Sequence, residues 1–167
     1  MKHLASLALA VAAFALGVTL GACSDDPADL AGEYSANLTA RDNGCNLAGW
    51  TAGNTATAIP VTITQTGSTA SADIGGISRI ALDLALGGHI FTGDVDISSF
   101  ELKLVGTQAL MNGNCAYTLN AELDGKLNGD SISGRLNFTA KTNGNPDCAV
   151  LETCVSYQEF TGSRPPR

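Results

Sequence analysis

Basic residues are scarce in this chain, and their scarcity narrows the classes of function that it can perform. The sequence holds 9 Lys and Arg against 16 Asp and Glu, which gives a formal net charge of −7 at neutral pH. Proteins that bind nucleic acid need clustered Lys and Arg to displace counterions, so we expect no nucleic-acid partner. The same shortage argues against broad electrostatic docking on anionic lipid headgroups.

Residues that commonly carry catalysis or bind metals are rare as well. Of two histidines, only His89 lies beyond the apolar N-terminal stretch, and no Cys-x-x-Cys pair occurs. A hydrolase triad needs a histidine beside a nucleophile, and we interpret His89 as a solvated loop residue. Asp94 and Asp96 fit the solvated face of a strand better than a calcium site, which needs six or more oxygen ligands. We therefore expect no catalytic residue, no metal and no cofactor, and hence no enzyme.

The N-terminal residues follow the pattern of an export signal with a lipid attachment site. Lys2 and His3 precede an uncharged stretch at 4–20, and small residues then lead to Cys23. A basic start, an apolar middle and small residues at the end are typical of a secretory signal peptide. The sequence LGAC at 20–23 resembles the bacterial lipobox, in which the cysteine is acylated before cleavage.

This pattern predicts the domain organisation and the location of the protein. We divide the chain into a lipoprotein signal peptide at 1–22, a lipidated tether at 23–30, a β-barrel domain at 31–162 and a tail at 163–167. Cys23 is the predicted lipidation site, and acyl chains such as palmitate on this residue would anchor the mature protein to a membrane of the cell envelope.

Apolar and polar residues alternate with period two along the predicted domain, which indicates half-buried strands. The spacing predicts strands near 34–41, 59–64, 70–74, 91–97, 100–104, 115–123, 132–140 and 155–162. The phase of the last strand is not evident from the sequence. The stretch 77–86 fits either a strand or a helix, and a helix leaves an even number of strands that close like known up-and-down barrels. We predict an all-β, eight-stranded antiparallel up-and-down barrel with one short helix near 77–86.

Four cysteines lie in or beside the long connections of this barrel, at 42–58, 75–89, 107–114 and 142–153. In a meander these connections share one end, and the chain enters the first strand at the opposite end. An even number of cysteines in an exported protein predicts two disulfides among Cys45, Cys115, Cys148 and Cys154. Closure of a short loop favours Cys148 with Cys154, which leaves Cys45 with Cys115, and this is the pairing that we predict. The geometry of neighbouring strands favours Cys45 with Cys154 and Cys115 with Cys148.

Small residues dominate the faces that we expect to point inward. They are Ala36, Ala40, Ala70, Ala72, Gly93, Ala121, Gly134 and Ala140. An eight-stranded barrel is either filled by side chains or holds one small ligand. The inward polar groups identified are Tyr34, Tyr117 and Tyr157, so an enclosed ligand is expected to be apolar, such as an acyl chain. Trp50, in the first long connection, either caps the interior or contacts a ligand or partner.

Several segments resemble a family of bacterial proteins. The lipobox, LAGEY at 30–34 and VTITQTG at 61–67 look like small envelope lipoproteins with a lipocalin-like barrel. The ending, from PDC at 146–148 to residue 166, is similar to a group of uncharacterised bacterial lipoproteins. Gly32-Glu33-Tyr34 approximates the glycine-x-tryptophan opening of lipocalins, with Tyr34 in place of tryptophan. The resemblance implies acylation at Cys23, and Ser24 after that cysteine implies sorting to the outer rather than the inner membrane.

These inferences lead to two hypotheses of function. The first is a membrane-anchored, non-catalytic lipoprotein that binds an apolar small molecule inside a lipocalin-like barrel. The second is an envelope scaffold or adaptor that binds another protein through its disulfide-stapled loop end, with Trp50 as a contact.

Overall fold

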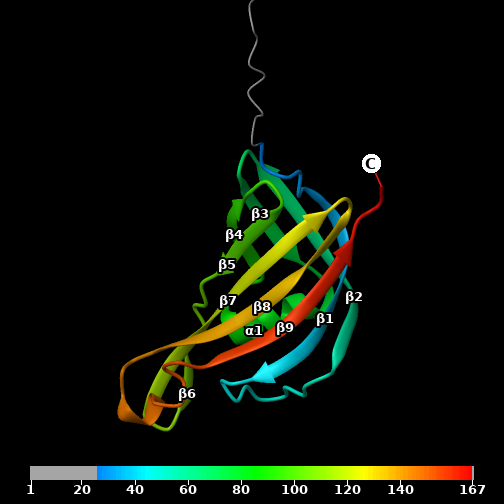
Figure 1. The fold of residues 1–167 in the computed structure, drawn as a ribbon. Helices are drawn as coiled ribbons and strands as arrows, with labels where there is room; N and C mark the ends of the chain where they lie inside the picture. The colour runs from blue at the N-terminus through cyan, green and yellow to red at the C-terminus, as the bar shows by residue number, and fades with distance from the viewer. Residues whose placement is uncertain (1–25, 167) are drawn as a thin grey trace, which may run out of the picture.

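The structure is a computed structural model that describes residues 26–166, so the predicted signal peptide and Cys23 lie outside the described residues. The described chain consists almost entirely of strands with one α-helix (Figure 1). Its elements are β1 (Gly32–Asn43), β2 (Thr55–Thr66), β3 (Thr69–Ile74), α1 (Gly76–Leu86), β4 (Ile90–Val95), β5 (Ser99–Leu104), β6 (Leu110–Asn112), β7 (Cys115–Asn128), β8 (Ser131–Thr142), η1 (Pro146–Cys148) and β9 (Val155–Ser163).

Eight of these strands close into an antiparallel barrel. Each strand of the ring pairs with its neighbour in the chain order β1-β2-β3-β4-β5-β7-β8-β9, and β9 pairs with β1 to complete it. The pairing of β5 with β7 joins Leu104 to Ala121 and Ser99 to Lys126. The predicted eight-stranded up-and-down barrel is confirmed.

β6 is a further strand that the sequence analysis missed. It spans three residues and pairs only with the first residues of β7, below the point where β5 ends. β7 is 14 residues long, so it has room to pair with β5 along one half and with β6 along the other. β6 therefore extends the sheet beyond the barrel and is not part of the ring.

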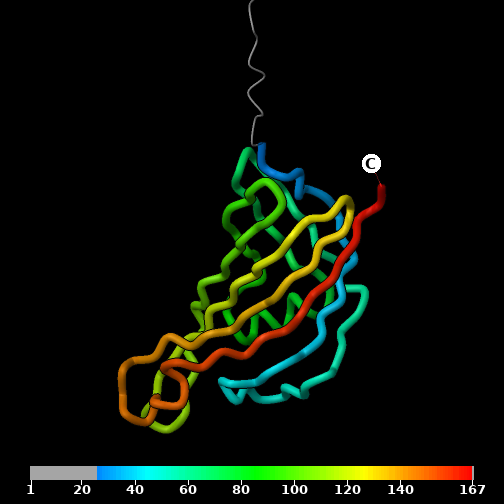
Figure 2. Tube along the Cα trace, viewed as in Figure 1, coloured from blue at the N-terminus to red at the C-terminus, as the bar shows by residue number. Residues whose placement is uncertain are grey.

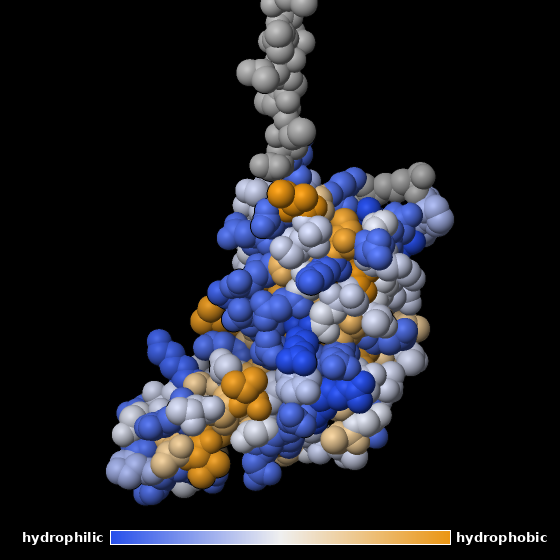
Figure 3. All heavy atoms as spheres, in the orientation of Figure 1, coloured by the Kyte–Doolittle hydropathy of each residue, from blue (hydrophilic) through white to orange (hydrophobic). Residues whose placement is uncertain are grey.

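Alternation along the strands places the core inside the ring, as predicted. In β7 the buried positions are Cys115, Leu119, Ala121 and Gly125, all of the same parity. The small residues expected to face inward include Ala70 and Ala72, which are 2% and 1% exposed. Because residues of the other parity face water, the outer face of the strands is largely hydrophilic (Figure 3).

The stretch 77–86 is a helix, which confirms the choice that the strand count favoured. α1 ends at Gly87, whose φ of 81° is the left-handed conformation typical of a glycine at a helix end. Leu86 is 1% exposed and fixes this end of the helix to the barrel. The Leu86 carbonyl accepts hydrogen bonds from the backbone N–H groups of Thr107 and Gln108. No helix in residues 26–166 is long and apolar enough to cross a membrane.

The two ends of the barrel differ in their connections (Figure 2). The short turns lie at one end, which we call the closed end, together with both ends of the described chain. The long connections, α1 and both disulfides lie at the opposite end, which we call the mouth. This separation follows from the meander order, and it matches the arrangement expected from the sequence.

The closed end is sealed by the residues before β1. Leu30 is fully buried, and its N–H donates to Gln65 Oε1 at 2.7 Å. Gln65 Nε2 in turn donates to the Ala28 carbonyl, and the Ala28 N–H donates to the Asp96 carbonyl. The last residues of the predicted tether at 23–30 are therefore packed onto the barrel instead of forming a free linker.

The disulfides join Cys45 to Cys154 and Cys115 to Cys148, with Cα–Cα distances of 4.8 and 5.0 Å. All four cysteines are thus bonded, but the pairing favoured by short-loop closure is wrong. Strand register explains the result: Cys45 follows β1 and Cys154 precedes β9, and these strands pair at Asn43 and Ser156. Loop-closure entropy changes slowly with length, so strand geometry decides the pairing. The second bridge joins the first residue of β7 to η1, which follows the neighbouring strand β8.

Candidate ligand cavity

The interior of the barrel is hollow. A cavity of about 620 Å³ extends through the middle of the ring. Every strand of the ring contributes at least one residue to its wall, and most of these side chains are aliphatic or aromatic. Of the eight small residues expected to face inward, Ala36 and Ala72 are part of that wall. The volume lies within the range of small-molecule sites in proteins, which is about 300–1,000 Å³.

Aromatic rings close the cavity toward the closed end. Phe100 is the second residue of β5 and Phe160 lies in the second half of β9, and their ring centroids are 6.2 Å apart. Beyond them the Tyr34 hydroxyl donates to the Leu30 carbonyl at 3.0 Å. Burial raises the pKa of Tyr34, and the nearby positive charge of Arg164 opposes that rise. At this end, Phe100 and Phe160 therefore give the cavity an apolar wall.

Trp50 covers the cavity at the mouth. Its ring packs edge-on against Phe138 at a centroid distance of 5.8 Å, and its Nε1–H donates to the Arg41 carbonyl at 2.9 Å. Both partners belong to strands of the barrel, so the structure places Trp50 as a cap on the interior. Trp50 also lines the cavity, so a contact between its ring and a ligand stays a prediction.

Helix α1 forms the rest of the roof. Its inner face presents Ser78, Ala81, Leu82 and Ala85 to the cavity. On its outer face, Ile77, Ile80 and Leu84 are 84%, 58% and 73% exposed. The helix is thus apolar on both sides, and a single helix separates the cavity from solvent at this place.

His89 holds this helix to the barrel, contrary to the expectation of a solvated loop residue. Its Nδ1 lies 2.7 Å from Asp83 Oδ1 on α1, and its Nε2 lies 3.6 Å from Asp73 Oδ1 on β3. The side chain is only 15% exposed. No sequence signal linked His89 to Asp83, because their contact depends on the helix that precedes the turn.

Three inward tyrosines were expected, and the structure separates them. Tyr34 belongs to the core near the closed end, and Tyr117 lines the cavity. Tyr157 lies on the other side of its strand, under the guanidinium of Arg135 at 4.7 Å. Gln158, its neighbour, is the residue of β9 that faces the cavity, and the sequence analysis missed it because the phase of this strand was not readable.

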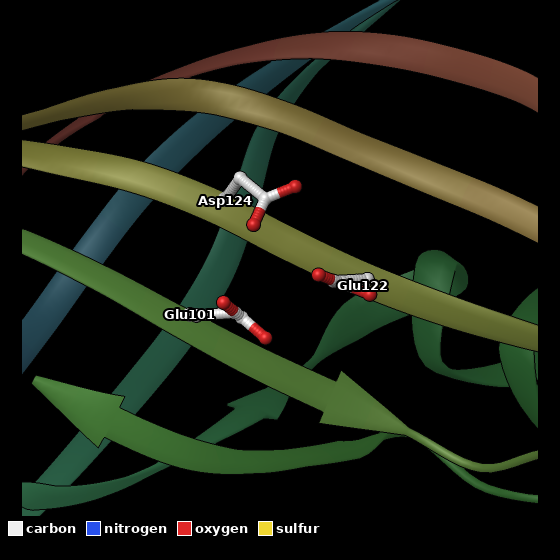
Figure 4. Close-up of side chains that lie close together, drawn as sticks. All are labelled: Glu101, Glu122 and Asp124. Atoms are coloured by element: carbon white, nitrogen blue, oxygen red, sulfur yellow. The ribbon is translucent and has the colours of Figure 1, made fainter.

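An acidic cluster lies outside the barrel, on β5 and β7. Carboxylate oxygens of Glu101, Glu122 and Asp124 lie within 4.8 Å of one another (Figure 4). Lys103 forms ion pairs with Glu101 and, at 3.9 Å, with Glu122. A hydrogen bond from Lys103 lowers the pKa of Glu101, whereas desolvation raises the pKa of Glu122, with Asp124 adding to the rise. The ammonium of Lys103 already balances part of this charge.

Asp94 and Asp96 lie in different structural elements. Asp94 is exposed on β4 and pairs across the sheet with Glu101. Asp96 lies in the turn after β4, where its Oδ1 accepts the Ile97 N–H at 2.8 Å. Their placement is that of solvated surface and turn residues.

Comparisons with family models, curated proteins and solved structures found no match to this chain.

Proposed function

We propose that this protein is a non-catalytic binder of an apolar small molecule, which it holds inside the barrel. The observation that carries the proposal is the hollow apolar interior, a cavity of about 620 Å³ whose wall is mostly aliphatic and aromatic. Among the described residues, the wall contains no carboxylate, imidazole, amine or free thiol, since its one cysteine, Cys45, is in a disulfide. Such a wall supports binding through burial of apolar surface.

The predicted lipid anchor at Cys23 belongs to the same proposal. An anchored carrier would keep its cargo site in the envelope, most simply at the outer membrane, as Ser24 favours. Labelling cells with a palmitate analogue checks the anchor: the wild-type protein should be labelled, and a Cys23→Ser variant should not. An unlabelled wild-type protein would remove the anchor from the proposal without affecting the cavity.

Binding can be tested with N-phenyl-1-naphthylamine, a neutral apolar dye that fluoresces in dry environments. The full chain carrying Cys23→Ser, exported so that its disulfides form, needs no detergent that would compete for the site. We expect saturable fluorescence from the wild-type cavity. Absence of any fluorescence increase would count against a hollow binding site.

Two substitutions on α1 test whether the dye binds inside the cavity. Ala85→Phe adds a ring on the cavity side of α1, and we expect the affinity for the dye to fall by about tenfold, or roughly 1.4 kcal/mol. Leu84→Phe adds a similar ring on the exposed side and should leave the affinity unchanged. Equal effects of both changes would place the dye outside the barrel.

An adaptor role is the second candidate, and one observation favours it. The end of the molecule that carries β6 and the disulfides projects beyond the ring (Figure 1), and Met111 of β6 (68%) and Val150 (72%) are exposed apolar side chains. Apolar residues exposed close together are typical of protein interaction sites. Photo-crosslinking from position 150 in cells should capture a defined partner, and capture lost in a Met111→Ser variant would support this role.

A further inference from the structure

We propose that the natural ligand is an uncharged amphiphile, such as a long-chain alcohol, amide or monoacylglycerol, and not a fatty-acid anion. This inference rests on the proposed binding function and deepens it. It follows from the charges around the cavity and from the polar side chains that face it.

The cavity wall offers nothing to balance a charge. Among the described residues that line it, none is Lys, Arg, His, Asp or Glu. A carboxylate without a cation loses its hydration on entering such a space, and this loss is costly enough that the group becomes protonated instead. An anion therefore has to stay at the mouth.

The cations near the mouth either have an acidic partner or lie on the outer face, away from the cavity. Arg41 forms two contacts with Glu159, including one of 2.7 Å, and Arg79 lies 3.7 Å from Asp83. Lys141 is exposed on the outer face of β8, away from the inward residues of that strand. The net charge of −7 on the whole chain disfavours the approach of an anion.

Polar groups in the wall nevertheless suit a neutral head group. Gln158 lies in the mouth half of β9, level with Ala40 on β1 and Leu136 on β8. Its side chain makes no hydrogen bond with another described residue, and the hydroxyl of Tyr117 likewise makes none. Both groups can donate and accept hydrogen bonds.

These positions give the ligand an orientation. Gln158 and Tyr117 belong to the mouth half of the barrel, whereas Phe100 and Phe160 close the other half. A hydroxyl or amide on the ligand would therefore lie near Gln158 or Tyr117, and its alkyl chain would extend toward the phenylalanines. Hydrogen bonds made in a dry cavity discriminate strongly between ligands that do and do not offer a partner.

The test displaces N-phenyl-1-naphthylamine from the Cys23→Ser chain with dodecanol, dodecanamide, dodecanoate and dodecane. At neutral pH, we expect dodecanol and dodecanamide to displace the dye at concentrations about tenfold or more below that of dodecanoate, because the anion must lose its hydration. At about pH 4, near the ordinary carboxyl pKa, dodecanoate should gain affinity while dodecanol does not. Dodecanoate that equals dodecanol at neutral pH would overturn the inference and leave the binding function intact. Dye that does not bind at all, together with ligands that do not bind in calorimetry, would overturn both.

Variants at Gln158 test the head-group contact. Gln158→Leu should reduce the advantage of dodecanol over dodecane by about fivefold or more, because the hydrogen bond is lost. Gln158→Lys should shift the preference toward dodecanoate, because it supplies the missing cation. Thr161→Leu, on the exposed face of the same strand, is the matched control and should change neither ratio. An unchanged ratio in both Gln158 variants would contradict the proposed position of the head group.

Discussion

The guanidinium of Arg164 lies over the ring of Tyr34, with its Cζ 5.5 Å from the ring centroid, and links the end of β9 to the start of β1. Arg164 is 9% exposed, and its Nε donates to Asp130 Oδ1 at 3.0 Å. Its Nη1 donates to the Ala31 carbonyl at 2.5 Å. One side chain from the predicted tail thus ties together three segments at the closed end.

Arg164→Ala should lower the free energy of unfolding by about 2–3 kcal/mol, because Asp130 and the Ala31 carbonyl lose a charged partner. Arg135→Ala is the matched control. That arginine also lies over a tyrosine, but it is exposed, so its removal should cost less than about 1 kcal/mol. Urea unfolding followed by far-ultraviolet circular dichroism measures both values, and equal costs would contradict a structural role of Arg164.

The two disulfides should differ in their contributions to stability. Cys45 and Cys154 are 109 residues apart, whereas Cys115 and Cys148 are 33 residues apart. Restriction of the unfolded chain gives about 5 kcal/mol for the first bridge and about 4 kcal/mol for the second. Paired Cys→Ser variants of each bridge, unfolded in urea without reductant, should follow this order. The reverse order would mean that local packing around Cys115 and Cys148, both fully buried, outweighs chain entropy.

His89→Ala should loosen the roof of the cavity while leaving the ring intact. The substitution removes the 2.7 Å contact between His89 and Asp83 on α1. Amide hydrogen exchange over 76–86 should become faster, because the contact with His89 is one of those that join α1 to the barrel. Exchange in β7 and β8 should stay unchanged. Asp73→Asn removes only the longer contact of His89 and should have a smaller effect, so a larger effect of Asp73→Asn would contradict this assignment.

The acidic cluster gives a prediction for pH dependence. Desolvation and Asp124 raise the pKa of Glu122 in the folded state, so the folded protein binds this proton more readily than the unfolded chain does. Stability associated with Glu122 is therefore present at low pH and decreases as the pH rises through the interval from the unfolded to the folded pKa. Glu122→Gln should stabilise the protein slightly at neutral pH, by less than about 0.5 kcal/mol after solvent screening. The gain should vanish below about pH 4, where the carboxyl is protonated in both states. The midpoints of urea unfolding at the two pH values give the sign of the stability change. A loss of stability at neutral pH in Glu122→Gln would contradict the prediction.

Most of the barrel could be predicted because most strands carry their own alternation signal. Alternation in β7 and β8 marks the buried parity without any knowledge of neighbouring strands. The helix at Gly76–Leu86 followed from a global argument, since only an even number of strands closes antiparallel. Local periodicity alone left that segment ambiguous.

What escaped prediction depends on contacts between distant segments. β6 is too short to show alternation, and it exists because β7 extends beyond β5. The cystine pairing depends on which strands are neighbours and on their register. The length of a loop does not indicate either of these. The inward position of Gln158 depends on the phase of β9, which its pairing with β1 and β8 fixes. The role of His89 depends on its contact with Asp83, which α1 brings close to it.

The mouth and the two ends of the described chain lie at opposite poles of the barrel. A reporter protein fused behind the C-terminal tail would therefore sit far from the mouth of the barrel. Ligand uptake and release could be followed with such a label in place, and a surface that tethers the N-terminal side would leave the entrance open to the aqueous compartment.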